Sequence, residues 1–203
     1  MFGKLRMIMN SGSVMGYFLQ ALPVALLAGA VYLLVRICHL KGKKERVRWG
    51  MELLRVLFVC YLTGLVSLVI LPANFWLRFY DGLFFGWWDQ VGPLFRLGDV
   101  NLVPSVVRYL RGELSLGSWV KTMLVGNMAM FVPLGFFLPL VTGIKTPCKT
   151  VIAAIAAPLC CEILQLLFGR SFDVDDLICN FAGIVIGAAI GSVVLKSANG
   201  KKA

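Results

Sequence analysis

EILQLLFGRSFDVDDLICN, residues 162–180, is the stretch that decides the fold. It places Glu162 and Gln165 inside one apolar run and Asn180 inside the next. A short polar turn between the two runs carries Arg170 and three aspartates. Because charged and amide side chains are costly inside hydrocarbon, an intramembrane glutamate is by default a candidate functional residue. The stretch therefore predicts two membrane helices that carry a functional polar group.

The composition of the whole chain indicates an integral membrane protein. Of its 203 residues, 59% are hydrophobic and the mean hydropathy is +0.84, well above the apolar share of an ordinary soluble domain. A bilayer leaves only helices and closed barrels as spanning structures, and the sequence lacks the alternating pattern of barrel strands. We therefore predict an all-α fold, an integral membrane helical bundle, with residues 1–203 forming a single membrane domain.

Several apolar runs are long enough to cross a bilayer, which takes about 20 helical residues. We expect five spans, at residues 14–37, 53–71, 123–142, 150–168 and 178–195. The connector at residues 73–121 is rich in Phe and Trp but interrupted by charges. Such a mixture is typical of a segment that lies in the membrane interface. Within the connector, residues 106–110 are predicted to form a short surface helix.

The formal net charge of +10 is distributed as a topology signal rather than as a nucleic-acid surface. Lys and Arg gather in the loop after the first run, around Lys145 and Lys149, and in the tail. With five spans these segments share one face, which the positive-inside rule makes cytoplasmic. We expect a multi-pass protein of the bacterial cytoplasmic membrane, with its amino terminus outside and its carboxyl terminus in the cytoplasm, and no nucleic-acid partner.

This topology brings the scarce polar side chains to one depth in the outer leaflet. The amides and the glutamate lie about one or two helical turns below the outer ends of their spans. The polar turn then lies above them as a layer of charge, so we expect an outward-facing polar groove. Its candidate ligand-binding residues are Asn127, Glu162, Gln165, Arg170, Asp173, Asp175, Asp176 and Asn180.

The acidic residues of this cluster allow more than one interpretation. Asp173, Asp175 and Asp176 would favour and cap the positive end of the last span. Alternatively, they would hold a divalent cation with Glu162, since Mg²⁺ and Ca²⁺ prefer oxygen ligands; three acids in four residues are a weak pattern beside a full metal-loop motif. Glu162 is either a structural group, neutral or paired with Arg170, or the candidate catalytic residue.

Sequence motifs of common enzyme classes are absent. There is no P-loop, no dinucleotide fingerprint and no HExxH motif. His39, the only histidine, adjoins the basic loop on the other face, which excludes a Ser-His or Cys-His pair in the polar cluster. The six cysteines have neither zinc-finger nor redox spacing. We therefore expect no cofactor.

Small residues recur every four positions in the last span, at Gly183, Gly187 and Gly191. This spacing allows close helix contact. Because a short turn joins the last two spans, we expect them to be antiparallel neighbours. The alanines of the fourth span, at residues 153–157, are the expected counterpart of the glycines.

A family resemblance rests on several ordered motifs. They are Asn101-Leu-Val-Pro104, Gly126-Asn127-Met-Ala-Met-Phe-Val-Pro133-Leu-Gly135-Phe, Glu162-Ile-Leu-Gln165, Arg170, Asp173-Val-Asp175-Asp176, Asn180 and Gly183. Together these motifs resemble the VanZ-like family over residues 101–195, and Asn101 thereby joins the candidate ligand-binding residues. The resemblance implies a connection with antibiotic resistance. The name-giving member is associated with lowered susceptibility to teicoplanin, a lipid-bearing glycopeptide that acts at the outer face.

Functions of different classes stay open. The first is a non-enzymatic membrane protein whose groove binds a lipid-like or cell-wall-related ligand. The second is an intramembrane, metal-dependent enzyme acting on a lipid-linked phosphate or cell-wall precursor, with Glu162 as general base. A transporter is a weaker option, because no inverted repeat is visible. The expected partners are membrane lipids and a lipid-linked cell-wall precursor or lipoglycopeptide, and a homodimer is left open.

Overall fold

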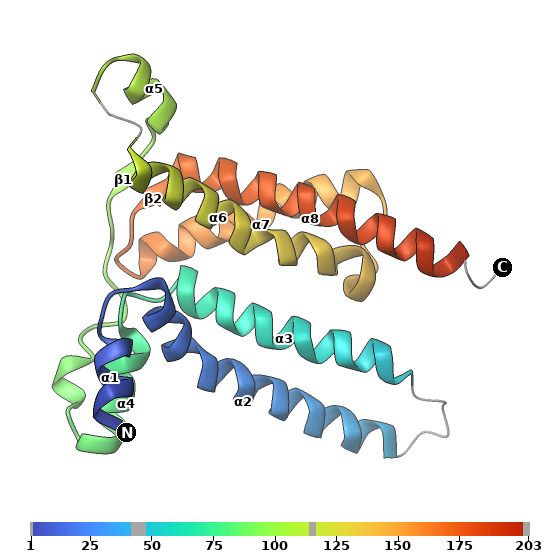
Figure 1. Cartoon of the computed structure of the whole chain (residues 1–203), viewed down its shortest axis with the longest axis horizontal. Coiled ribbons are helices and arrows are strands. Elements are labelled where there is room, and N and C mark those ends of the chain that lie inside the picture. Colours follow the sequence, from blue (N-terminus) through green and yellow to red (C-terminus); the bar gives the residue numbers. More distant parts are fainter. Residues whose placement is uncertain (1, 42–47, 114–116, 201–203) are drawn as a thin grey trace. The chain divides into compact units, whose positions relative to one another are not determined.

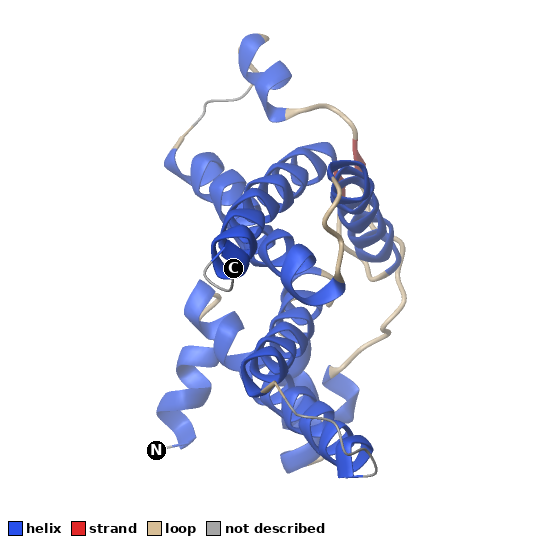
Figure 2. Cartoon of the chain, turned by 90° about the vertical axis from the view of Figure 1, so that its right-hand side faces the viewer, coloured by secondary structure: helices blue, strands red, loops and turns tan. Residues whose placement is uncertain are grey.

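A computed structural model describes residues 2–41, 48–113 and 117–200 of the chain. Helix accounts for nearly all of its regular structure (Figure 2). The chain forms two compact units, Met1–Arg96 and Leu97–Ala203, and each is described by itself. Some of the basic residues used in the topology prediction lie outside the described residues: Lys43, Lys44, Arg46, Lys201 and Lys202.

The first unit is built on a hairpin of two long helices. Helices α2 (Val14–Lys41) and α3 (Trp49–Val69) pack side by side and run in opposite directions (Figure 1). A short helix, α1 (Phe2–Met9), packs on α2 and was not predicted from the sequence. Part of the aromatic connector forms α4 (Phe75–Phe85) and the 3₁₀ turn η1 (Trp88–Gln90).

Charged side chains in the first unit pair with one another. The buried Glu52 accepts hydrogen bonds from Arg36 at 3.0 Å to each of its oxygens, and Arg55 donates to it at 2.6 Å. The guanidinium groups of Arg36 and Arg55 therefore share one carboxylate. Arg6 likewise pairs with Asp81 at 3.0 Å. Pairing lowers the cost of placing these charges beside apolar helices.

The second unit contains three long helices. They are α6 (Ser118–Phe137), which continues into the π-helical turn η2 (Leu138–Thr142), α7 (Pro147–Leu167) and α8 (Val174–Gly200). Helices α6 and α8 run in the same direction. Helix α7, which lies between them in the sequence, runs in the opposite direction (Figure 1). The π turn begins next to Pro139, which has no amide proton to continue the α-helical hydrogen-bond ladder.

The glycine stripe of α8 packs against α6, and the expectation that it faces the fourth span was wrong. A Cβ atom at any of the three glycines would lie 1.9–2.4 Å from a backbone carbonyl oxygen of α6. The glycines Gly183, Gly187 and Gly191 face the carbonyls of Met128, Val132 and Phe136, respectively. Both sets recur every four residues, so two parallel helices contact each other along a continuous line. Small residues make such close backbone approach possible.

A two-residue parallel strand pair, not predicted from the sequence, joins distant parts of the second unit. In β1 (Val100–Asn101) and β2 (Phe172–Asp173), Val100 pairs with Phe172 and Asn101 pairs with Asp173. The backbone amide of Gly98 also donates to the carbonyl of Leu166 at 2.9 Å. The chain that precedes α5 (Ser105–Leu110) is therefore fixed along the turn between α7 and α8.

Within the described part of the chain, five helices are long and apolar enough to cross a membrane, which confirms the predicted helical membrane bundle. These candidate spans are Val14–Lys41, Trp49–Val69, Thr122–Thr142, Pro147–Leu167 and Val174–Ala198. The last one begins four residues before the expected start at residue 178. Asp175 and Asp176 consequently lie in the first turn of α8 rather than in the preceding loop.

Candidate functional site

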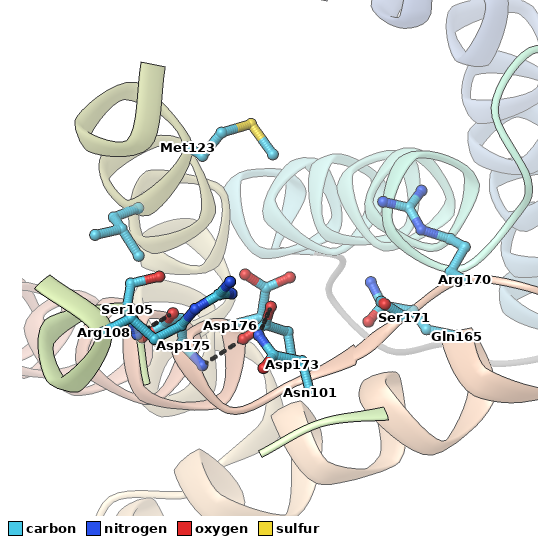
Figure 3. A pocket seen from close by; sticks show the side chains of 11 residues that line it. Asn101, Ser105, Arg108, Met123, Gln165, Arg170, Ser171, Asp173, Asp175 and Asp176 are labelled. Atoms are coloured by element: carbon cyan, nitrogen blue, oxygen red, sulfur yellow. Dashed lines mark hydrogen bonds between the residues drawn. The ribbon is translucent and has the colours of Figure 1, made fainter. Parts of the chain in front are cut away.

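A pocket of about 340 Å³ lies in the second unit, where α6 and α8 begin and α7 ends (Figure 3). The small helix α5 and the turn before β2 complete its wall. Eleven residues line it: Asn101, Ser105, Arg108, Met123, Leu124, Gln165, Arg170, Ser171, Asp173, Asp175 and Asp176. Six of the nine candidate ligand-binding residues are among them. Asn127, Glu162 and Asn180 do not line it.

Glu162 lies behind the pocket and supports its backbone. Its side chain is fully buried, with 0% exposure. One carboxylate oxygen, Oε2, accepts the backbone N–H of Asp173 at 2.8 Å. The other, Oε1, has no hydrogen-bond partner among the described residues. Glu162 therefore fixes the position at which the turn enters α8, and its contact with the pocket is indirect.

Asn180 on α8 and Gln165 on α7 carry buried side-chain amides. Asn180 is 2% exposed, and its Oδ1 atom has no hydrogen-bond partner among the described residues. Gln165 is 3% exposed and reaches the pocket wall. The predicted polar cluster thus has two parts. One part is buried behind the pocket, and the other lines it.

Asp173 connects three segments of the second unit. Its Oδ1 accepts the backbone N–H of Asp175 at 2.8 Å, which is an N-terminal cap of α8. Its Oδ2 accepts the side-chain amide of Asn101 at 2.9 Å. Its own backbone N–H is donated to Glu162. The capping interpretation of the acidic turn is therefore correct for this residue, and the Asn101 contact explains how β1 is held.

The other two aspartates bind different partners. Asp175 Oδ2 accepts the backbone N–H of Ser105 at 2.8 Å, which attaches the start of α5 to the start of α8. Asp176 Oδ1 accepts the side-chain amide of Asn127, which links α8 to α6. Both aspartates also line the pocket. They therefore position helices and contribute carboxylates to the pocket wall.

The aspartates do not converge as a metal centre would require. Across residues 2–41, 48–113 and 117–200, no three side chains of His, Cys, Asp and Glu are grouped so as to hold a metal ion. Asp173, Asp175 and Asp176, the candidate metal ligands, are engaged with Asn101, Ser105 and Asn127 instead. The described geometry gives no support to a divalent-cation site.

Five lining residues were not predicted as site residues: Ser105, Arg108, Met123, Leu124 and Ser171. Arg108 is the most informative, because it adds a second guanidinium to the one supplied by Arg170. Residues 106–110 were expected to form a short surface helix. The contact between Ser105 and Asp175 brings α5 to the pocket, and no local sequence signal predicts a contact across 70 residues.

The pocket lies at the edge of the apolar segments. Met123 is one residue inside the candidate span that starts at Thr122, and Gln165 is two residues from the end of the span that closes at Leu167. Asp175 and Asp176 lie in the first turn of the last span. Three span ends therefore meet at one level, where headgroups and water replace hydrocarbon.

Comparison with known proteins identifies the family of the chain. A family model described as VanZ/LLP1 matches residues 58–195. This range contains every residue that lines the pocket and begins earlier than the motif-based range of 101–195, within α3. No curated protein and no solved structure matches the chain.

Proposed function

The chain belongs to the VanZ/LLP1 family, and on that premise we propose that it is a binding protein of the bacterial cell envelope. Its pocket holds the polar head of a lipid-like or cell-wall-related ligand. Through this binding it lowers susceptibility to lipoglycopeptide antibiotics such as teicoplanin. The observation that carries the proposal is the pocket itself, because it combines charged, amide and apolar side chains at the end of three apolar helices.

The chemistry of the wall supports a ligand with a polar head and an apolar tail. Met123 and Leu124 form an apolar part of the wall on α6, and both lie inside a candidate span. The aspartates, arginines, amides and two serines form the remainder. Lipid headgroups reside at the edge of a bilayer, so a site at this level favours a lipid headgroup over a wholly soluble ligand.

The distribution of basic residues supports an outward orientation of the pocket. Lys145 and Lys149 lie near the start of α7, and Lys196 lies near the end of α8, so all three belong to the ends opposite the pocket. Basic residues favour the cytoplasmic side. On this basis the amino terminus and the pocket face outward and the carboxyl terminus is cytoplasmic. A lipoglycopeptide and the lipid-linked cell-wall precursors are encountered on that outer side.

A pocket-filling variant tests the proposal. Ser171→Trp places a large side chain in the pocket without changing any charge, and Ser197→Trp puts the same residue near the exposed end of α8, away from the pocket. Both variants and the wild type are expressed in a susceptible bacterium, and tolerance of teicoplanin is compared with tolerance of a glycopeptide that has no lipid chain. We expect Ser171→Trp to lose the teicoplanin tolerance that the wild type and Ser197→Trp retain.

The lipids that co-purify with each variant give a second readout, by mass spectrometry. Wild type and Ser197→Trp should retain a shared amphiphile that Ser171→Trp lacks. Equal tolerance and equal lipid content in all three proteins, with equal amounts in the membrane, would contradict the proposed function. Chemical conversion of the bound amphiphile by the wild type would favour the enzymatic alternative.

A further inference from the structure

We propose that α5 is a membrane-surface helix whose partner is the lipid bilayer. Its apolar side chains enter the leaflet beside the pocket, while Ser105 and Arg108, on another side of the same helix, form part of the pocket wall. This interaction surface is independent of which ligand the pocket binds.

The segment around α5 exposes several large apolar side chains although it lies outside the candidate spans. Leu110 is 78% exposed and Val106 is 55% exposed. The exposed set is Leu102, Val103, Val106, Tyr109 and Leu110. Single exposed apolar residues are ordinary on a protein surface, but a group concentrated on one short segment marks an interaction surface.

The helical period separates this apolar group from the pocket wall. Within α5, Val106, Tyr109 and Leu110 are three and four residues apart and therefore share one face. Ser105 and Arg108, which line the pocket, are three residues apart and share another. Helix α5 is thus amphipathic, with polar groups toward the pocket and apolar groups on a different side.

The depth of α5 follows from its attachment to α8. The backbone N–H of Ser105 donates to Asp175, which lies in the first turn of the last candidate span. Figure 1 places α5 to the side of the starts of α6 and α8, and Figure 2, turned by 90°, shows the same sideways displacement. A helix beside the ends of membrane spans is next to headgroups and the upper part of the acyl chains.

Two further side chains of this segment suit that level. Tyr109 has an apolar ring and a polar hydroxyl group, and such rings concentrate at membrane interfaces. Arg111, directly after α5, is exposed, and its long stem allows the guanidinium group to reach lipid phosphates. An apolar face beside basic residues is typical of a helix that lies in the interface.

The neighbouring wall of the pocket also faces lipid. Met123 lines the pocket, lies inside a candidate span and is 48% exposed. Val125 of the same span is 58% exposed. The pocket therefore borders the lipid on its α6 side, and one partner, the bilayer, covers the apolar surfaces of both α5 and α6. A soluble protein on α5 would have to displace lipid from this border.

Photolabelling from the lipid tests this surface. The full-length protein is placed, one copy to a nanodisc, in phosphatidylcholine and phosphatidylglycerol. The probe is a phosphatidylcholine whose acyl chain carries a diazirine next to its ester carbonyl, and labelled peptides are identified by mass spectrometry. We expect label on Tyr109 and Leu110 at a yield comparable to that on Met123.

A matched pair of double variants tests the apolar face. Val106→Asn with Leu110→Asn should lose the label from α5. Its α5 amides should also exchange with deuterium roughly tenfold faster, because two apolar side chains no longer hold the helix in lipid. The control is Val100→Asn with Leu97→Asn, which changes the same residue types at similar exposure, 57% and 75%, outside α5. It should leave both the label on α5 and the exchange unchanged.

Each result decides for or against the membrane surface. An unlabelled α5 beside a labelled α6 in the wild type overturns the proposal and leaves the binding function of the pocket standing, and this result is decisive even if the double variant does not insert. Label on α5 that the double variant retains overturns the assignment of the apolar face. In nanodiscs that hold two copies, loss of the label from α5 overturns the proposal and assigns the face to a second copy of the chain.

Discussion

Substitution of Gly187 by alanine tests the contact that holds the second unit together. A Cβ atom at this position would lie 1.9 Å from the carbonyl oxygen of Val132, where ordinary contacts are 3.4 Å or longer. Because the obstacle is backbone and not a flexible side chain, α6 and α8 must separate by about 1.5 Å. Such overpacking costs about 1–3 kcal/mol. Alanine's better helix propensity returns about 1 kcal/mol, so we expect a net destabilisation of up to about 2 kcal/mol.

The same helices provide a matched control for this substitution. A Cβ atom at Gly126, on α6, would meet nothing within 4 Å, so Gly126→Ala should be neutral or slightly stabilising. The free energy of unfolding of both purified variants is measured in detergent micelles, by titration with a denaturing detergent. Gly187→Ala should unfold earlier than the wild type, and Gly126→Ala should not. An unfolding free energy of Gly187→Ala equal to that of Gly126→Ala would refute the close α6–α8 contact.

Three further predictions concern single side chains. Glu162→Ala leaves the Asp173 N–H without its acceptor beside a cavity and should cost about 3 kcal/mol of unfolding free energy. Glu162→Gln keeps an acceptor and should cost less than half as much. Equal losses in the two variants would contradict the contact between Glu162 and Asp173. Glu52→Ala removes the shared acceptor of two guanidinium groups that are each about one-third exposed, with Arg36 at 29%. In the same titration we expect the unfolding free energy to fall by about 2 kcal/mol, which is less than for a fully buried pair. Burial raises the pKa of Tyr80 above its ordinary value of 10.0, so its stabilising contribution is complete below pH 10 and is lost as the pH rises through the raised pKa; Tyr80→Phe should abolish that part of the alkaline pH dependence, and an unchanged profile would exclude it.

The spans were predictable because apolar runs of this length have one stable arrangement in a bilayer. The start of α8 was harder to predict, since Asp175 and Asp176 were assigned to a loop on account of their charge. Asp173 caps the helix, and acidic residues in the first turn are favoured by the positive helix end. The same charges that indicated a turn therefore belong to the helix, and the boundary differs by one turn.

The partner of the glycine stripe was not predictable from chain order. A short connection between α7 and α8 favours contact between consecutive helices, and those helices do contact each other. The closest backbone approach, however, is with α6, which precedes α7 in the chain. Four-residue spacing indicates that some backbone lies close to the glycines and contains no information about which one.

The candidate site was predicted in part, because two kinds of signal were involved. Residues 162–180 are adjacent in sequence, so their proximity follows from one helical turn and a short connection. Arg108 and Ser105 reach the pocket only through the strand pair at Asn101 and the bond to Asp175. Two-residue strands leave no periodic pattern, and tertiary contacts of this length leave no local one.

The buried glutamate illustrates why a costly polar group inside a membrane segment need not contact the ligand. Glu162 was the leading candidate for chemistry, yet it binds the backbone of Asp173 and does not line the pocket. Without that acceptor, the half-buried amide of Asp173 would lose its partner at the point where the turn enters α8, and a donor left unsatisfied costs free energy. Holding this amide fixes the backbone directly before Asp175 and Asp176. The carboxylate in the apolar helix thus determines the geometry of the carboxylates beside the pocket, so its loss is expected to alter ligand preference through their positions.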